Sequence, residues 1–95
     1  MNRITFTSYD KFQNLFVELH RLIPEKFIKP YWTPPPKEYK SSKYRVWINN
    51  GVRLDPTGNI IDFGKPFDKP PTSTVNGFVF YFRDEQDYIM ALLLK

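Results

Sequence analysis

The 95-residue sequence contains no cysteine and only one histidine, His20. Without cysteine the chain can form no disulfide and has no thiolate ligand for a metal ion, which fits a reducing compartment. A single histidine cannot make a nitrogen- or sulfur-rich zinc site, and it leaves few ways to build a nucleophile–base pair. Because His20 lies at the edge of an apolar helical stripe, we interpret it as a surface or boundary residue.

Glycine is also scarce, and its placement argues against a phosphate-binding loop. The four glycines are scattered, each at a turn or loop end: Gly51, Gly58, Gly64 and Gly77. Neither a dinucleotide-binding fingerprint nor a P-loop is present. The acidic group Asp84, Glu85 and Asp87 has the ligands of a hard-cation site, but its position at a predicted helix start explains it without a metal. We therefore expect no enzymatic activity, no cofactor and no metal.

No apolar run is long enough to cross a membrane. The longest, "FVFYF" and "ALLL", fall far short of the roughly 20 residues that a membrane-spanning helix needs. The first residues, "MNRITFTSYDKFQNLF", lack the apolar run of a signal peptide. These observations predict one soluble cytoplasmic domain over residues 1–95 that does not contact membranes.

Aromatic residues make up 18% of the chain, which is a high share. The order of apolar and polar residues predicts individual strands and helices. "RITFTS" alternates as a half-buried strand. "TSYD" has a helix-capping pattern, and a helix ended by Pro24 is predicted by the apolar spacing of Phe12, Leu15, Phe16, Leu19, Leu22 and Ile23.

The second half of the sequence predicts strands followed by a helix. "YRVWINNGVRL" is interpreted as a hairpin that turns at Asn50-Gly51, since this pair suits a type I′ turn. "DPTG" predicts a second turn and "NIIDF" a third short strand. "FVFYF" predicts a central strand covered on both faces, and Asp84 a helix N-cap. We expect an α+β fold, with a mostly antiparallel sheet and two helices packed on one face, ferredoxin-like or an irregular variant.

The net charge of +4 is concentrated in one stretch, residues 25–45, which we call the basic segment. It holds two acids, Glu25 and Glu38, and six cations: Lys26, Lys29, Lys37, Lys40, Lys43 and Arg45. The remaining eight cations and eight acids cancel. A local basic region steers its protein toward acidic proteins, membrane surfaces or nucleic acids.

Rings and prolines within this stretch favour protein binding. A proline-stiffened loop loses little entropy on binding, and Tyr, Trp and Arg are frequent hot-spot residues. The predicted partner-binding set is Lys29, Tyr31, Trp32, Lys37, Tyr39, Lys40, Lys43, Arg45 and Trp47. For Tyr31 and Trp32 taken singly, a structural role as rings that cover the sheet is favoured slightly over a place in the interface. Nucleic-acid binding, to single-stranded DNA or RNA, is the alternative, because cations interleaved with rings suit phosphate contact and base stacking.

About the last twenty residues carry a resemblance to known proteins. "FVFYFRDEQDYIMALLLK" runs from an aromatic strand into an acid-capped short helix, and in a chain of about this length it resembles small accessory proteins encoded by bacteriophages. The resemblance implies a protein that binds and inhibits or redirects a host factor, such as a defence nuclease or the transcription machinery, in the bacterial cytoplasm. It transfers no functional residues. The oligomeric state, monomer or homodimer, stays open.

Overall fold

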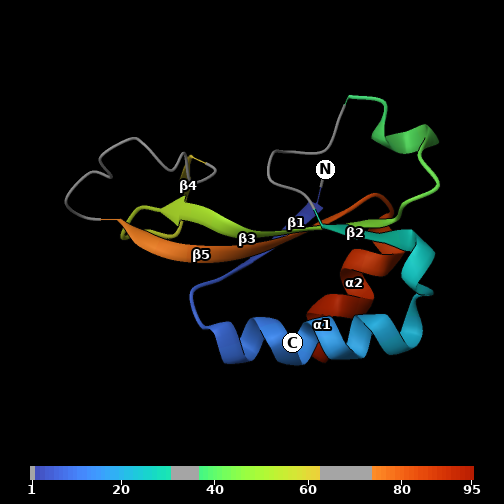
Figure 1. The fold of residues 1–95 in the computed structure, drawn as a ribbon, viewed down its shortest axis with the longest axis horizontal. Helices are drawn as coiled ribbons and strands as arrows, with labels where there is room; N and C mark the ends of the chain where they lie inside the picture. Colours follow the sequence, from blue (N-terminus) through green and yellow to red (C-terminus); the bar gives the residue numbers. More distant parts are fainter. Residues whose placement is uncertain (1, 31–36, 63–73) are drawn as a thin grey trace.

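The computed structural model describes residues 2–30, 37–62 and 74–95 (Figure 1). The strands are β1 (Asn2–Phe6), β2 (Ile28–Pro30), β3 (Val46–Leu54), β4 (Ile60–Asp62) and β5 (Val75–Phe82). The helices are α1 (Tyr9–Leu22) and α2 (Glu85–Leu94), with short 3₁₀ turns η1 (Glu25–Phe27) and η2 (Tyr39–Ser41). The predicted α+β class is confirmed.

The strands form one mixed sheet in the order β1-β5-β3-β2, with β4 also paired to β3. All pairings are antiparallel except that of β2 with β3. Within the described residues the order is strand, helix, four strands and helix, which differs from the ferredoxin-like order and fits the irregular variant.

Both helices lie on the same side of the sheet (Figure 1). Ser8 caps α1, because its hydroxyl accepts a hydrogen bond from the Lys11 amide at 3.3 Å. The apolar stripe of α1, with Phe12, Leu15 and Leu19 buried, packs on the inward side chains of the sheet. Those side chains are Ile4, Phe6, Val46, Ile48, Phe80 and Phe82.

The opposite face of the sheet holds a second apolar cluster. Its buried members are Trp47, Val52, Leu54, Val79 and Tyr81. Tyr39, Tyr44 and Ile60 pack against this cluster as half-buried side chains. Alternate residues of β5 enter the two clusters, so the predicted burial of "FVFYF" on both faces is confirmed.

The predicted hairpin turn at Asn50-Gly51 is wrong, because β3 continues straight through it. Asn49 pairs with Val79 and Val52 with Gly77, which leaves two residues of β3 opposite one residue of β5. This is a β-bulge, and the Asn49 side-chain Oδ1 stabilises it by accepting the Gly51 amide at 2.9 Å. The type I′ turn is absent, since among the described residues only Gly58 has a positive φ.

The bulge also shifts the alternation of side chains along β3. Before it, Trp47 faces away from the helices, while Val46 and Ile48 face toward them. After it, Val52 and Leu54 join Trp47 in the second cluster. One inserted residue thus reverses which positions point to each face, as expected from the two-residue period of a strand.

Strand β2, which lies within the basic segment, is not among the predicted strands. Ile28, Lys29 and Pro30 pair in parallel with Val46, Trp47 and Ile48. Strand β2 ends the sheet order beside β3. A proline is accommodated on such an edge strand because its missing donor can face away from the ladder.

Gly77 is fixed by close packing rather than by backbone geometry. A Cβ atom at this position would lie 2.5 Å from Leu54 Cδ1 and 3.1 Å from Val52 Cγ2. Leu54 is 1% exposed and cannot swing into solvent without opening the second cluster. We therefore expect Gly77→Ala to lower the free energy of unfolding by about 1–3 kcal/mol through overpacking.

Chemical denaturation measures this change, with Asn76→Ala as the matched control. Asn76 is the neighbouring residue of β5 and is exposed. Equal stability of the two variants would contradict the packing explanation.

Candidate protein-binding site

The described part of the basic segment before β3, residues 37–45, is held by hydrogen bonds of its own. The Ser41 hydroxyl donates to the Glu38 carbonyl at 3.0 Å within η2. The Ser42 hydroxyl accepts the Tyr44 amide at 3.1 Å. The stretch therefore has a defined local shape where it enters the sheet.

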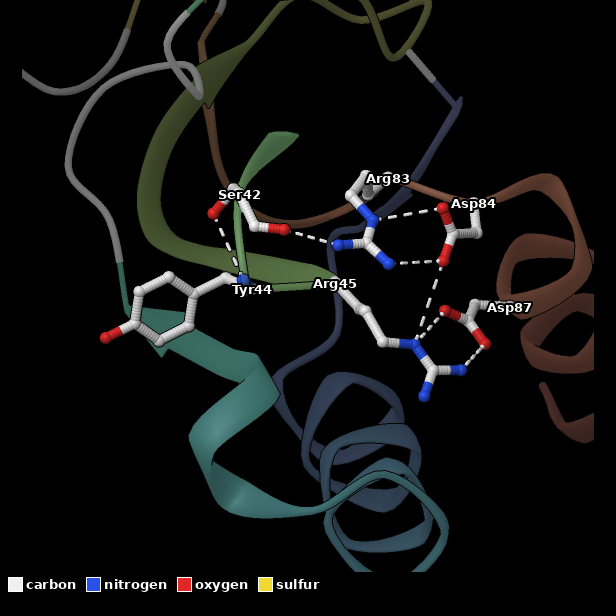
Figure 2. Close-up of polar contacts among 6 residues, drawn as sticks. All are labelled: Ser42, Tyr44, Arg45, Arg83, Asp84 and Asp87. Atoms are coloured by element: carbon white, nitrogen blue, oxygen red, sulfur yellow. Dashed lines mark hydrogen bonds and ion pairs between the residues drawn. The ribbon is translucent and has the colours of Figure 1, made fainter. Parts of the chain in front are cut away.

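Two arginines and two aspartates anchor this stretch to the start of α2, and we call them the arginine–aspartate cluster (Figure 2). Arg45 forms a two-pronged pair with Asp87, in which its Nε donates to Oδ2 at 2.9 Å. Arg83 pairs with Asp84 through two hydrogen bonds of 3.0 and 2.9 Å. Arg45 Nε also lies 3.8 Å from Asp84 Oδ2, which links the two pairs.

The same cluster reaches the backbone of the basic segment. A side-chain nitrogen of Arg83 donates to the Ser42 carbonyl. The Arg45 amide donates to the Phe27 carbonyl, and the Arg83 amide donates to the Arg45 carbonyl, both at 2.8 Å. Residues 37–45 are thus tied to η1, to the end of β5 and to the first turn of α2.

Electrostatics within the cluster favour the charged forms of Asp84, Arg45 and Arg83. Hydrogen bonds from Arg83 lower the pKa of Asp84, assisted by the charges of Arg83 and Arg45 and opposed by partial burial. The hydrogen bond to Asp87 raises the pKa of Arg45. Asp84 is the N-cap of α2 as predicted, yet its carboxylate makes no capping bond because it binds the arginines instead.

The lysines of the stretch differ from the arginines. Lys37, Lys40 and Lys43 are exposed, and within the described parts of the chain none of the three forms an ion pair. Lys43 Nζ lies 5.3 Å from the centre of the Tyr44 ring. Lys29 Nζ, from β2, lies 5.1 Å from the same ring. Tyr44 therefore holds two ammonium groups near its ring by cation–π attraction.

The structure places the predicted partner-binding residues in different environments. Lys29, Lys37, Lys40 and Lys43 are exposed, while Tyr39 is half-buried against the second cluster. Arg45 is occupied by Asp87 and Asp84. Tyr31 and Trp32 lie outside the described residues, so whether they cover the core or face a partner stays a prediction.

Trp47 requires a correction as a surface anchor. It is 2% exposed and belongs to the second apolar cluster. Trp47 faces away from Val46 and Ile48, on the side of the sheet opposite the helices. The face carries a core of its own, so Trp47 contributes stability rather than a contact surface.

The remaining candidate chemistry is sparse in the described parts of the chain. The His20 ring is half-buried and packs beside Phe16, with 4.3 Å between ring centres. Among residues 2–30, 37–62 and 74–95, no group of three or more His, Asp or Glu side chains is placed to hold a metal ion. No helix in those ranges combines the length and apolar character needed to span a membrane.

Comparison of the chain with protein-family models, curated proteins and solved structures found no match.

The Arg45–Asp87 pair generates a stability prediction. Asp87 is 4% exposed, and its removal would leave Arg45 without its closest partner. Asp87→Asn keeps the shape but loses the charge, so we expect the free energy of unfolding to fall by about 1–3 kcal/mol. Denaturant titration measures the change.

Asp10→Asn is the matched control, because Asp10 also lies in the first turn of a helix but is exposed. Both variants lose a favourable interaction with the helix dipole, so their difference isolates the ion pair. An equal loss in the two variants would assign no stability to the Arg45–Asp87 contact.

Asp84 generates a prediction for pH. Its pKa is lower in the folded chain than in the unfolded chain, where it is about 3.9. Its contribution to stability is therefore fully present above the unfolded pKa and is lost as pH falls through the lower folded pKa. Asp84→Asn, which preserves an N-cap side chain, should flatten the acid limb of the stability curve between about pH 5 and pH 2.

Asp55 also has a lowered pKa, caused first by the Thr57 hydroxyl, and it contributes separately to the acid limb. Asp55→Asn therefore serves as the comparison variant. An acid limb in Asp84→Asn as steep as that of the unaltered protein would show that the arginine contacts do not set this pH dependence.

Proposed function

We propose that this chain is a non-enzymatic binding protein that docks on an acidic surface of another protein through the lysines of its basic segment. The observation that carries the proposal is that the arginines and the lysines differ in their contacts. Arg45 and Arg83 bind the neighbouring aspartates, whereas Lys37, Lys40 and Lys43 project from the same anchored stretch without an ion pair to a described residue.

Anchoring favours binding because it reduces the entropy lost on association. Residues 37–45 are fixed through Ser42, Arg45 and the arginine–aspartate cluster before any partner arrives. Tyr44 restrains Lys43 and Lys29 near its ring. A pre-formed group of cations of this kind speeds association with an acidic partner and fixes its orientation.

The resemblance of residues 78–95 to small phage-encoded accessory proteins supports a bacterial host protein as the partner. On this proposal the chain inhibits or redirects a defence nuclease or a component of the transcription machinery in the host cytoplasm. An acidic docking surface on that partner is what the exposed lysines would recognise.

Binding of single-stranded DNA or RNA is the second candidate, favoured by the alternation of lysines with Tyr39 and Tyr44. Both rings, however, pack against the second apolar cluster and are half-buried. A base-stacking platform needs open ring faces, so the geometry supports phosphate contact better than stacking. Protein docking requires no open ring and is therefore the stronger proposal.

A pull-down from bacterial lysate tests the main proposal. We expect the tagged protein to retain a specific partner, and the double variant Lys40→Glu plus Lys43→Glu to reduce retention at least tenfold, because four units of charge change where the acidic surface docks. Increasing salt should weaken retention by the unaltered protein.

The matched control is Lys11→Glu plus Arg21→Glu, which changes the charge equally at exposed positions of α1. Equal retention by both double variants would overturn the role of the basic segment. Nucleic-acid binding is measured separately by fluorescence anisotropy against salt. If four lysines contact phosphates, log K should fall with log salt with a slope of roughly −2.8 on single-stranded DNA, and absence of binding at low salt eliminates the alternative.

A further inference from the structure

The chain contains two Asn-Gly pairs, Asn50-Gly51 and Asn76-Gly77, and they lie in different parts of the central ladder. An asparagine followed by glycine is especially prone to spontaneous deamidation, because glycine has no side chain to hinder its backbone nitrogen or to restrict the backbone angles. Both asparagines are exposed. Exposure therefore does not distinguish the two pairs, and the backbone around each one determines its reactivity.

Deamidation consumes water and releases ammonia. The backbone nitrogen of the glycine gives up its proton and attacks Cγ, the side-chain carbonyl carbon of the asparagine before it. The N–Cγ bond forms and the Cγ–Nδ2 bond breaks, so that ammonia leaves with the proton and a succinimide ring remains. Water then opens the ring at one of its two carbonyls, which gives aspartate or isoaspartate. Closing the ring requires the asparagine backbone to leave the extended conformation of a paired strand.

The pair in β5 is held against this rearrangement. Asn76 pairs with Arg53, and Gly77 pairs with Val52. Gly77 is buried, and a single carbon added there would lie 2.5 Å from Leu54 Cδ1. The succinimide ring can therefore close at Asn76 only after β5 separates from β3, which requires the centre of the sheet to open.

The pair in β3 lies where the ladder is interrupted. The register of β3 with β5 passes over Asn50 and Gly51, because Asn49 and Val52 are the residues paired on either side of the bulge. The pairings of β3 with the described strands β2 and β4 do not include Asn50 or Gly51 either. Residues of a bulge that stand outside the ladder can change their backbone angles while the neighbouring pairs stay formed.

One side chain restrains the bulge. Asn49 Oδ1 accepts a hydrogen bond from the Gly51 amide at 2.9 Å, and the nitrogen of that amide is the nucleophile of the reaction. Asn49 is fully buried, and within the described parts of the chain its Nδ2 has no hydrogen-bond partner. A buried donor without a partner costs about 1–3 kcal/mol. The contact with Gly51 is thus the interaction that this buried amide makes.

We propose that Asn50 is a site of spontaneous deamidation in the folded protein, and that the Asn49 side chain limits the rate by holding the Gly51 amide. The reaction replaces a neutral amide with a carboxylate, which lowers the net charge from +4 to +3. Isoaspartate also adds one methylene to the backbone of β3, where the bulge already contains an extra residue. The chain therefore changes its charge and the length of β3 with age, without an enzyme.

Ageing the full chain in neutral buffer tests the choice of site. Trypsin releases residues 46–53 as one peptide, because Arg45 and Arg53 are its cleavage sites, and Asn76 falls in a different peptide. Mass spectrometry measures deamidation in each peptide, and fragment ions assign it to Asn50 rather than Asn49. A sample digested without ageing corrects for deamidation during digestion.

We expect Asn50 to deamidate at least about tenfold faster than Asn76 in the folded chain, because only Asn76 requires the sheet to open. In urea neither pair is constrained by a strand, so the two rates should become similar. Unfolding thus serves as the control for the intrinsic reactivity of each Asn-Gly pair.

Substitutions of Asn49 test the restraint. Asn49→Ala removes the acceptor and should raise the Asn50 rate about two- to tenfold, the equivalent of one hydrogen bond. Asn49→Ser supplies a weaker acceptor of the kind that Ser42 offers to the Tyr44 amide, so its rate should lie between those of Asn49→Ala and the unaltered protein. The Asn76 rate in the same digests reports whether each variant is folded, because unfolding would raise it.

The same variants are also aged in urea. There all three chains should deamidate at Asn50 at the same rate, which separates the lost hydrogen bond from any intrinsic effect of residue 49. Asn49→Ser keeps a polar group at the buried position, so it tests the restraint even if Asn49→Ala does not fold.

Two results would overturn the proposal. The first is an Asn50 rate as low as that of Asn76 in the folded chain, with both rising together in urea, which would show that the bulge is as rigid as the paired ladder. The second is an Asn50 rate that neither substitution of Asn49 changes, which would show that the hydrogen bond to Gly51 does not restrain the reaction. Neither result concerns the lysines of the basic segment, so the two proposals fail independently.

Discussion

The antiparallel pairing of β3 with β5 is the contact on which the other elements depend. Strand β5 carries β1 on its far side, and β3 carries both β2 and β4. The two central strands also supply side chains to both apolar clusters. A chain of 95 residues without cysteine has no disulfide to add stability, so burying both faces of one sheet is how it assembles enough apolar contact. The bulge between Asn49 and Val52 places Val52 and Leu54, which follow it, in the second cluster beside Trp47.

The sequence predicts the elements whose signals are local. Helix α1 and its end before Pro24, the strands β1 and β4, and the doubly buried end of β5 follow from periodicity and punctuation. The errors arise where pairing with a strand distant in the sequence determines the local structure. Asn50-Gly51 is a strong turn signal, but continuous pairing with β5 on both sides of it favours a bulge. Strand β2 exists because β3 offers it an edge, which three residues of sequence do not reveal.

The same limit applies to the charged residues of the candidate site. A count of cations treats Arg45 and the neighbouring lysines alike, so it predicts a basic segment but not which of its cations form ion pairs. The fold separates them, because it brings Asp84 and Asp87 from a helix more than thirty residues later to Arg45. No local sequence pattern predicts that Arg45 contacts these two aspartates. A bidentate pair uses the planar geometry of arginine, whereas an exposed lysine retains its charge for solvent or a partner.

The pairing of β1 with β5 has a consequence for how the chain acquires its structure. Asn2 pairs with Phe82 and Phe6 with Phe78, so the first strand pairs with a strand more than sixty residues further along the chain. Such a closure between distant segments slows folding. During synthesis, Ile4, Phe6 and the apolar stripe of α1 leave the ribosome before β5 exists to cover them. The nascent chain therefore carries exposed apolar surface until β5 has been made, and this interval is when it is most open to aggregation or to capture by a chaperone.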